Sequence, residues 1–144
     1  MLEAFDQENP DVIIVEGQGA LSHPTYLSST AILRGSMPAG VILQHAPARK
    51  VISDFPTVKM PTAASEVNLI ETFAKTKVIG LTINHENMTD AEVSAAILLY
   101  EVELGIPATD ALTRPSDRLV DMVLHAFPHL NSMAAVDIGG PRIG

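Results

Sequence analysis

The chain has 144 residues, of which 47% are apolar and none is cysteine; this suits one domain over residues 1–144 with a buried core, and it excludes disulfides and thiolate sites. The net charge of −8, without any basic run, argues against nucleic acid as the main partner. No segment reaches the ~18 uninterrupted apolar residues of a membrane span, and the acidic N-terminus is unlike a signal peptide, so we expect a cytoplasmic protein without membrane contact.

Short apolar runs alternate with helical patterns along the chain. Three runs are apolar without alternation, which predicts strands buried on both faces, as in a parallel sheet; they lie at 12–15, 41–43 and 78–84. Helical patterns cover 25–33, 65–77 with Ser65 as N-cap, 89–104 with a Thr89–Glu92 capping box, and 115–126. Residues 135–144 are consistent with a short strand or a loose end.

This alternation predicts an α/β fold with a doubly wound parallel sheet. Ligands of such sheets bind beyond the carboxyl ends of the strands. The candidate site residues are therefore the polar and glycine residues that follow the three runs: Glu16, Gly17, Gln18, Gly19, Gln44, His45, Asn84 and His85. We expect Glu16, His45 or its neighbour Gln44, and Asn84 to lie at the same edge of the sheet.

Glu16 closes an apolar run and is followed by glycines. An acidic residue in this position is typical of a Walker B strand, where the carboxylate holds Mg²⁺ directly or through water while bare backbone approaches a γ-phosphate. The alternative is a water-exposed glutamate beside a glycine turn. A dinucleotide fingerprint is disfavoured, because Ser22 replaces its third glycine and no acid occurs between Glu16 and Asp54 to hold a ribose.

The same acid-free stretch, residues 17–53, forms a local positive zone that would stabilise an anionic small-molecule ligand. Its cationic and imidazole side chains are His23, Arg34, His45, Arg49 and Lys50. Chance clustering on a solvated face is the alternative. The histidines that follow the runs could also converge on zinc, although histidines at strand ends are more often polar surface.

Residues 11–24, DVIIVEGQGALSHP, resemble a family long catalogued as a domain of unknown function and now associated with D-glutamate N-acetyltransferase. The stretches GLTIN and IPATDAL continue the resemblance, which covers about residues 11–124. Members of that family combine a Rossmann-like N-terminal domain with a C-terminal P-loop domain. The resemblance therefore implies a P-loop NTPase-like fold and a nucleotide-type site.

A more distant resemblance to dethiobiotin synthetase and the cobyrinate amide-forming enzymes implies roles for individual residues. It implies that Glu16 binds Mg²⁺, that Gly17 and Gly19 lie near the γ-phosphate, and that Asn84 touches an adenine. Gln18, His45 and Arg49 complete the expected ligand site. The expected cofactor is Mg²⁺ with ATP, or acetyl-coenzyme A.

The pattern departs from the family because no Gly-x-x-x-x-Gly-Lys-[Ser/Thr] motif occurs. We therefore expect the back half of a P-loop domain, a partial doubly wound sheet that lacks the Walker A strand and exposes a sheet edge. The resemblance implies an N-acetyltransferase at full length, with His23 as the candidate base and little activity in this piece alone. The alternative is a non-catalytic binding or assembly module that another chain completes, and a homo-oligomer stays open.

Overall fold

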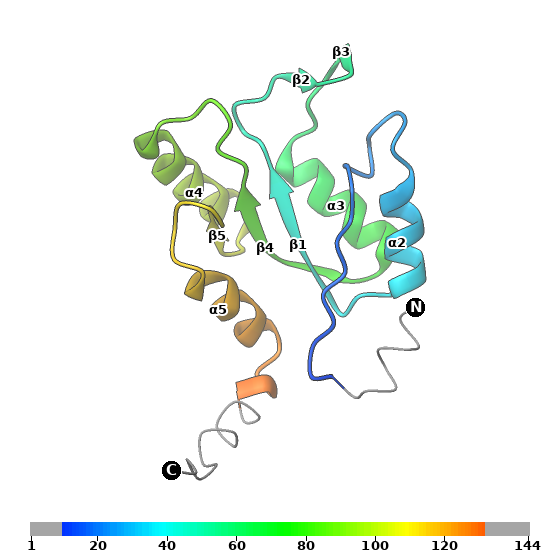
Figure 1. Ribbon diagram of the computed structural model, residues 1–144, viewed down its shortest axis with the longest axis vertical. Coiled ribbons are helices and arrows are strands. Elements are labelled where there is room, and N and C mark those ends of the chain that lie inside the picture. Colours follow the sequence, from blue (N-terminus) through cyan, green and yellow to red (C-terminus); the bar gives the residue numbers. More distant parts are fainter. Residues whose placement is uncertain (1–9, 132–144) are drawn as a thin grey trace, which may run out of the picture.

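A three-stranded parallel sheet organises the fold (Figure 1). The computed structural model describes residues 10–131. The sheet has the order β1 (Gly40–His45), β4 (Lys77–Ile83), β5 (Ala108–Thr109). Crossover helices α3 (Ala63–Ala74) and α4 (Asp90–Leu104) connect these strands, so the predicted α/β fold with a parallel sheet is confirmed.

Different helices cover the two faces of the sheet. Side chains alternate along β4, so successive residues of this strand pack against opposite layers. Leu81 and Ile83 pack in one cluster with Ala63 of α3 and Tyr100 of α4. On the other face, Gly80 leaves room for Met122 of α5 (Asp117–Ala126), whose sulfur lies only 2.5 Å from where a Cβ on Gly80 would sit. With helices on both faces of only three strands, the described residues form a partial doubly wound sheet.

Helices α3 and α4 begin at capping residues that the sequence makes recognisable. Thr89 and Glu92 form the predicted capping box, and Gly105, with φ of 66°, ends α4 in the left-handed conformation. The N-cap of α3 is Thr62 rather than the predicted Ser65, since the Thr62 hydroxyl accepts from the Ser65 amide at 3.1 Å. α2 (Ser28–Ser36) begins three residues later than predicted, α5 begins at Asp117, and residues 135–144 lie outside the described part.

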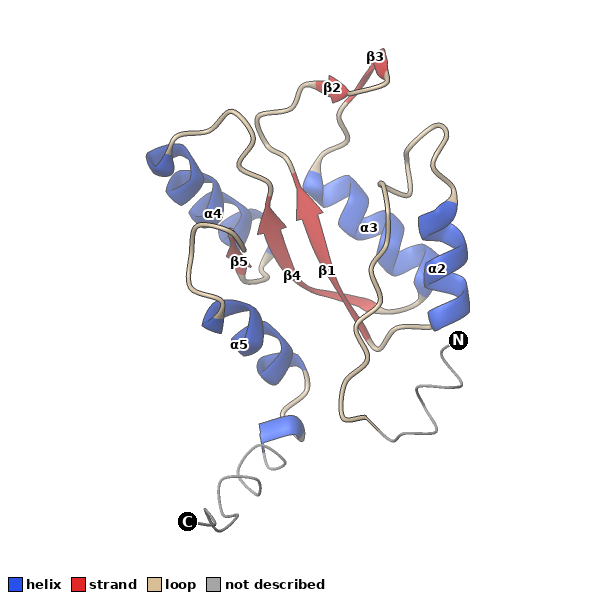
Figure 2. Ribbon diagram, viewed as in Figure 1, coloured by secondary structure: helices blue, strands red, loops and turns tan. Residues whose placement is uncertain are grey.

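The predicted strand at 12–15 is wrong. These residues form no strand, and Val12 and Ile14 are 50% and 91% exposed; Figure 2 draws the segment as a loop. A β-branched run becomes a strand only when a neighbour supplies a hydrogen-bond ladder, and no residue in 10–131 does so here. β1 is therefore an edge strand of the described sheet. This agrees with the exposed sheet edge that was expected from the sequence.

A small antiparallel ribbon, β2 (Val51–Ile52) and β3 (Phe55–Lys59), was not expected from the sequence. Its two-residue turn and very short first strand carry too little pattern to be recognised. Among the described helices, none is both long and apolar enough to cross a membrane.

Candidate functional site

The carboxyl ends of the three parallel strands bring four polar side chains to one edge. His45 ends β1, Asn84 and His85 follow β4, and Asp110 follows β5. The Asn84 amide donates to the His45 carbonyl at 2.8 Å, which continues the β1–β4 ladder past the strands. His45 and Asn84 therefore share an edge as expected, whereas Glu16 lies on no strand and is not placed by the sheet.

The His45 ring is buried and both of its nitrogens are engaged. Nε2 lies 2.9 Å from the Pro61 carbonyl and Nδ1 lies 2.7 Å from the Tyr100 hydroxyl. A carbonyl only accepts, so Nε2 carries the hydrogen and Nδ1 accepts from Tyr100. Burial, helped by the negative charge of Glu103, raises the pKa of Tyr100 to about 12, which keeps this hydroxyl a donor. The ligand role of His45 stays a prediction, and this geometry gives its ring a structural one.

Asn84 and Arg49 are each engaged near the same edge. The Asn84 side-chain oxygen accepts from the Glu86 amide at 3.1 Å, which shapes the turn after β4. Arg49 forms an ion pair with the carboxylate of Glu86, and both side chains are partly exposed. Exposed pairs of this kind contribute little stability, so an incoming anion could compete for Arg49 at small cost.

His85 and Asp110 form the most tightly held polar pair at this edge. Nδ1 of His85 lies 2.6 Å from Oδ2 of Asp110, whose side chain is fully buried. Asp110 also accepts from the Leu112 amide at 2.9 Å and the Thr113 hydroxyl at 2.7 Å. Burial alone would raise the pKa of Asp110, but the hydrogen bonds from Leu112, Thr113 and His85 outweigh it and hold the pKa below its ordinary value.

The Gly17–Gln18–Gly19 loop is fixed against the start of α2. The Ser29 hydroxyl lies 2.6 Å from the Gln18 carbonyl and 2.7 Å from the Gly19 carbonyl. Gly19 has a φ of 78°, and a Cβ there would come within 3.1 Å of the Tyr26 Cβ. These constraints account for a glycine at position 19 without any ligand.

Glu16, the predicted metal ligand, is exposed. Residues 10–131 contain no group of three or more His, Cys, Asp or Glu side chains able to hold a metal ion. A single carboxylate is still compatible with Mg²⁺, which keeps most of its waters and takes one or two carboxylates beside substrate phosphates. The Mg²⁺ role of Glu16 stays a prediction.

His23, the predicted base, caps a turn. Its Nδ1 lies 3.2 Å from the Thr25 amide nitrogen and 3.1 Å from that of Tyr26, and its ring stacks on Tyr26 at 4.3 Å. A neutral imidazole has one nitrogen able to accept, and in His23 the two amides occupy it. Action as a base would require both bonds to break, so this role stays a prediction that the geometry does not favour.

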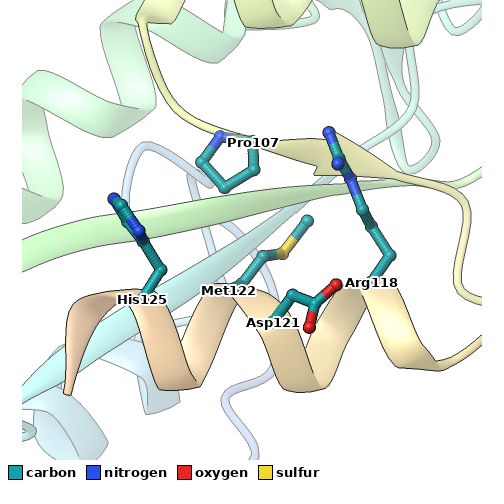
Figure 3. Close-up of a pocket in the computed structure, with 5 residues that line it drawn as sticks. All are labelled: Pro107, Arg118, Asp121, Met122 and His125. Atoms are coloured by element: carbon teal, nitrogen blue, oxygen red, sulfur yellow. The ribbon is translucent and has the colours of Figure 1, made fainter. Parts of the chain in front are cut away.

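A separate pocket of about 280 Å³ lies between α5 and the segment before β5 (Figure 3). Its lining residues are Pro107, Arg118, Asp121, Met122 and His125. Pro107 precedes β5 and Asp110 follows it, so the pocket lies away from the carboxyl edge of the sheet.

Asp110 was not identified as a site residue from the sequence, because β5 has only two residues, too few for a recognisable strand pattern.

Comparisons with known proteins agree with the resemblance noted above. Residues 1–120 match the sequence model of a family described as "Domain of unknown function (DUF1611_C) P-loop domain". A protein of Tritonibacter scottomollicae named D-glutamate N-acetyltransferase is 28% identical over 122 residues, covering 81% of this chain and 37% of that protein. A protein of the same name from Pseudoalteromonas sp is 26% identical over 121 residues, covering 80% and 36%.

A solved structure supports the fold. The crystal structure of a DUF1611 family protein from Anabaena variabilis superposes with a TM-score of 0.79 at 27% identity, covering 86% of this chain and 38% of that one. The chain thus spans little more than a third of the length of the relatives it matches.

Proposed function

The chain belongs to the DUF1611_C P-loop domain family, and on this premise we propose that it forms part of a D-glutamate N-acetyltransferase-like protein. The observation that carries the proposal is that two relatives matched over about four-fifths of the chain both bear that name. Because those relatives are much longer, the segment would supply one portion of the active protein. Its portion would be a site for a phosphorylated ligand at the carboxyl edge of the sheet.

The ligand in this proposal is anionic: acetyl-coenzyme A, or ATP with Mg²⁺. Glu16 is exposed, so a metal would displace only water from it. Arg49 offers a cation whose present ion pair with Glu86 is weak enough to exchange. Residues 17–19 lie in a loop held by Ser29, which presents bare backbone in a constant shape.

The experiment is carried out on a full-length protein that carries this segment. Acetylation of D-glutamate by acetyl-coenzyme A should be measured for the wild type and for Glu16→Gln at saturating Mg²⁺. If Glu16 holds a metal, the substitution removes the charge that offsets the ion, so turnover should fall strongly while the melting temperature is unchanged. Asp11→Asn, in the same exposed segment, is the matched control and should leave turnover unchanged.

One result would contradict the metal role of Glu16, and another would contradict the weak ATP binding expected of this chain alone. Unchanged turnover in Glu16→Gln would make Glu16 a surface residue, since surface substitutions usually stay within about ±0.5 kcal/mol. Binding of ATP by the 144-residue chain itself is expected to be weak, because charge-assisted phosphate contacts worth roughly 1.5–3 kcal/mol each are lacking without a Walker A motif. A micromolar dissociation constant by calorimetry with Mg²⁺ would refute that expectation.

An assembly role is the second candidate, and one specific observation favours it. β1 borders the described sheet, and the apolar segment 12–15 takes part in no ladder. A strand supplied by another domain or chain would satisfy the open backbone groups of β1. Tight association with such a partner, without any acetyl transfer, would support this role over the enzymatic one.

A further inference from the structure

Three histidines follow apolar runs in the sequence, and they differ in what their ring nitrogens contact. In His45 both nitrogens are engaged by Pro61 and Tyr100. In His23 the accepting nitrogen is engaged by two backbone amides. His23 and His85 both have an Nε2 for which residues 10–131 provide no hydrogen-bond partner, but in neutral His23 this nitrogen carries the hydrogen because Nδ1 accepts from the amides. Among these three, His85 is the one whose Nε2 can be both unpartnered and an acceptor.

The contact with Asp110 determines which nitrogen of His85 accepts a proton. The lowered pKa of Asp110 keeps this carboxyl ionised at neutral pH, and a carboxylate only accepts hydrogen bonds. Nδ1 of His85, 2.6 Å away, must therefore carry a hydrogen. The lone pair of the neutral ring is then on Nε2, and the side chain is 34% exposed, so a ligand at the sheet edge could reach it.

We propose that His85 and Asp110 form a proton-accepting pair in which Nε2 of His85 takes a proton from a primary ammonium substrate. In this role Asp110 is a positioning residue that sets the tautomer and offsets the positive charge of the imidazolium. The identification of the substrate as an amine rests on the proposed acetyltransferase function. The inference deepens that function by naming the base within this segment.

The proton and electron balance is that of amide formation from a thioester. An ammonium N–H bond breaks, its proton goes to Nε2 of His85, and its electron pair stays on the amine nitrogen. That pair forms a C–N bond to the acyl carbon as the C–S bond breaks. Of the three ammonium protons, one stays on the amide nitrogen, one neutralises the leaving thiolate, and one passes through His85 to water.

A purely structural explanation also exists, and it predicts something different. Asp110 accepts from the Leu112 amide and from Thr113, so it shapes the turn after β5 whatever His85 does. A merely structural contact would not require an accessible lone pair on Nε2. The Nδ1–H tautomer is necessary for the proposal but follows from the contact in both explanations, so the loss of kcat and the altered pH profile in the full-length protein separate them.

The first test uses the 144-residue chain. Two-bond ¹H–¹⁵N correlation spectra report the tautomer of each neutral histidine, and His85→Gln assigns the His85 signals. We expect the Nδ1–H tautomer for His85, and faster modification of His85 than of His45 by diethyl pyrocarbonate, as located by mass spectrometry. An Nε2–H tautomer, or protection equal to that of His45, would overturn the proposal, and the modification rate, which is measured on the wild type alone, decides the matter even if His85→Gln fails to fold.

The second test uses a full-length protein that carries this segment. His85→Gln should lower kcat for amine acetylation by about 10²–10⁴-fold, with the KM for the acyl donor unchanged, because only proton transfer is lost. Asp110→Asn should also lower kcat and should alter the pH profile, whereas Thr113→Val, which keeps the pair, should change kcat little. Full activity of His85→Gln would overturn the pair and leave the acetyltransferase function standing. If the wild type showed no acetyl transfer, the proposed function would fail and the amine substrate with it, while an Nε2–H tautomer would overturn the pair independently of that function.

Discussion

Replacement of His45 by phenylalanine tests whether this residue holds the fold together, as its contacts indicate. The phenyl ring keeps the flat shape and burial of the imidazole but supplies no nitrogen. It leaves the Tyr100 hydroxyl and the Pro61 carbonyl without the partners they now have at 2.7 and 2.9 Å. If His45 served only to bind a ligand, the same substitution would leave the stability of the free protein nearly unchanged.

The expected cost follows from the burial of the two groups left behind. Tyr100 is only 7% exposed, so its unpaired hydroxyl should cost about 1–3 kcal/mol. The bond to Pro61 is only part-buried, so water recovers some of that loss and about 1 kcal/mol remains. We therefore expect a loss of about 2–4 kcal/mol in the free energy of unfolding, a large fraction of the ~5–15 kcal/mol of a typical domain.

Urea unfolding followed by circular dichroism measures this loss. With an m-value of about 2 kcal/mol/M, the midpoint of His45→Phe should fall by about 1–2 M while m is unchanged. His125→Phe, at an exposed position of α5, should stay within about 0.5 kcal/mol of the wild type.

A double-mutant cycle tests the assigned hydrogen bond itself. Tyr100→Phe in the His45→Phe background removes the orphaned hydroxyl, so the double variant should be less destabilised than the sum of the single variants, by about 0.5–3 kcal/mol. Additive effects, or a loss below about 0.5 kcal/mol in His45→Phe alone, would refute the structural role.

Three further predictions concern other parts of the fold. Gly80→Ala should lower stability by about 1–3 kcal/mol in thermal melting, because its Cβ would come within 2.5 Å of the sulfur of buried Met122; Gly35→Ala, which meets nothing within 4 Å, is the control and should cost nothing. The folded pKa of Asp110 is below its ordinary 3.8, so its carboxylate stabilises the fold above that pH and this contribution disappears as the pH falls through the folded pKa. The stability difference between wild type and Asp110→Asn should shrink accordingly in acid; a constant difference would contradict this. Glu66→Met should raise the urea midpoint, because Oε2 of this buried glutamate has no hydrogen-bond partner among residues 10–131. The expected gain in the free energy of unfolding is about 1 kcal/mol or more. A lower midpoint would show that the carboxylate has a partner.

Local features of the chain were readable from the sequence alone. The helix at 89–104 was predicted to within a residue, because the Thr89–Glu92 box and Gly105 mark its ends by chemistry that acts over three or four positions. The runs at 41–43 and 78–84 were recognised as strands of a parallel sheet from their apolar, non-alternating composition. Burial on both faces is confirmed for β4, whereas it is wrong for β1, where Ile42 is exposed because β1 is an edge strand of the described sheet. The rule that ligands bind beyond the carboxyl ends then indicated His45, Asn84 and His85 as neighbours.

Features that depend on distant neighbours were decided by the tertiary structure. The run at 12–15 has the composition of a strand but no ladder partner in the described residues, and backbone pairing is a property of two segments rather than one. β5 is recognisable only because Ala108 and Thr109 pair with β4. No local pattern marks a two-residue strand, so the placement of Asp110 at the sheet edge could not be anticipated.

The histidines show this division most clearly. In sequence, His23, His45 and His85 are alike, each a polar residue near the end of an apolar run. In the folded chain, His23 caps a turn, His45 is buried between two hydrogen-bond partners, and His85 contacts a buried carboxylate. The chemistry of an imidazole depends on which nitrogen holds the hydrogen, and that is set by the atoms packed against each nitrogen, which only the folded structure brings together.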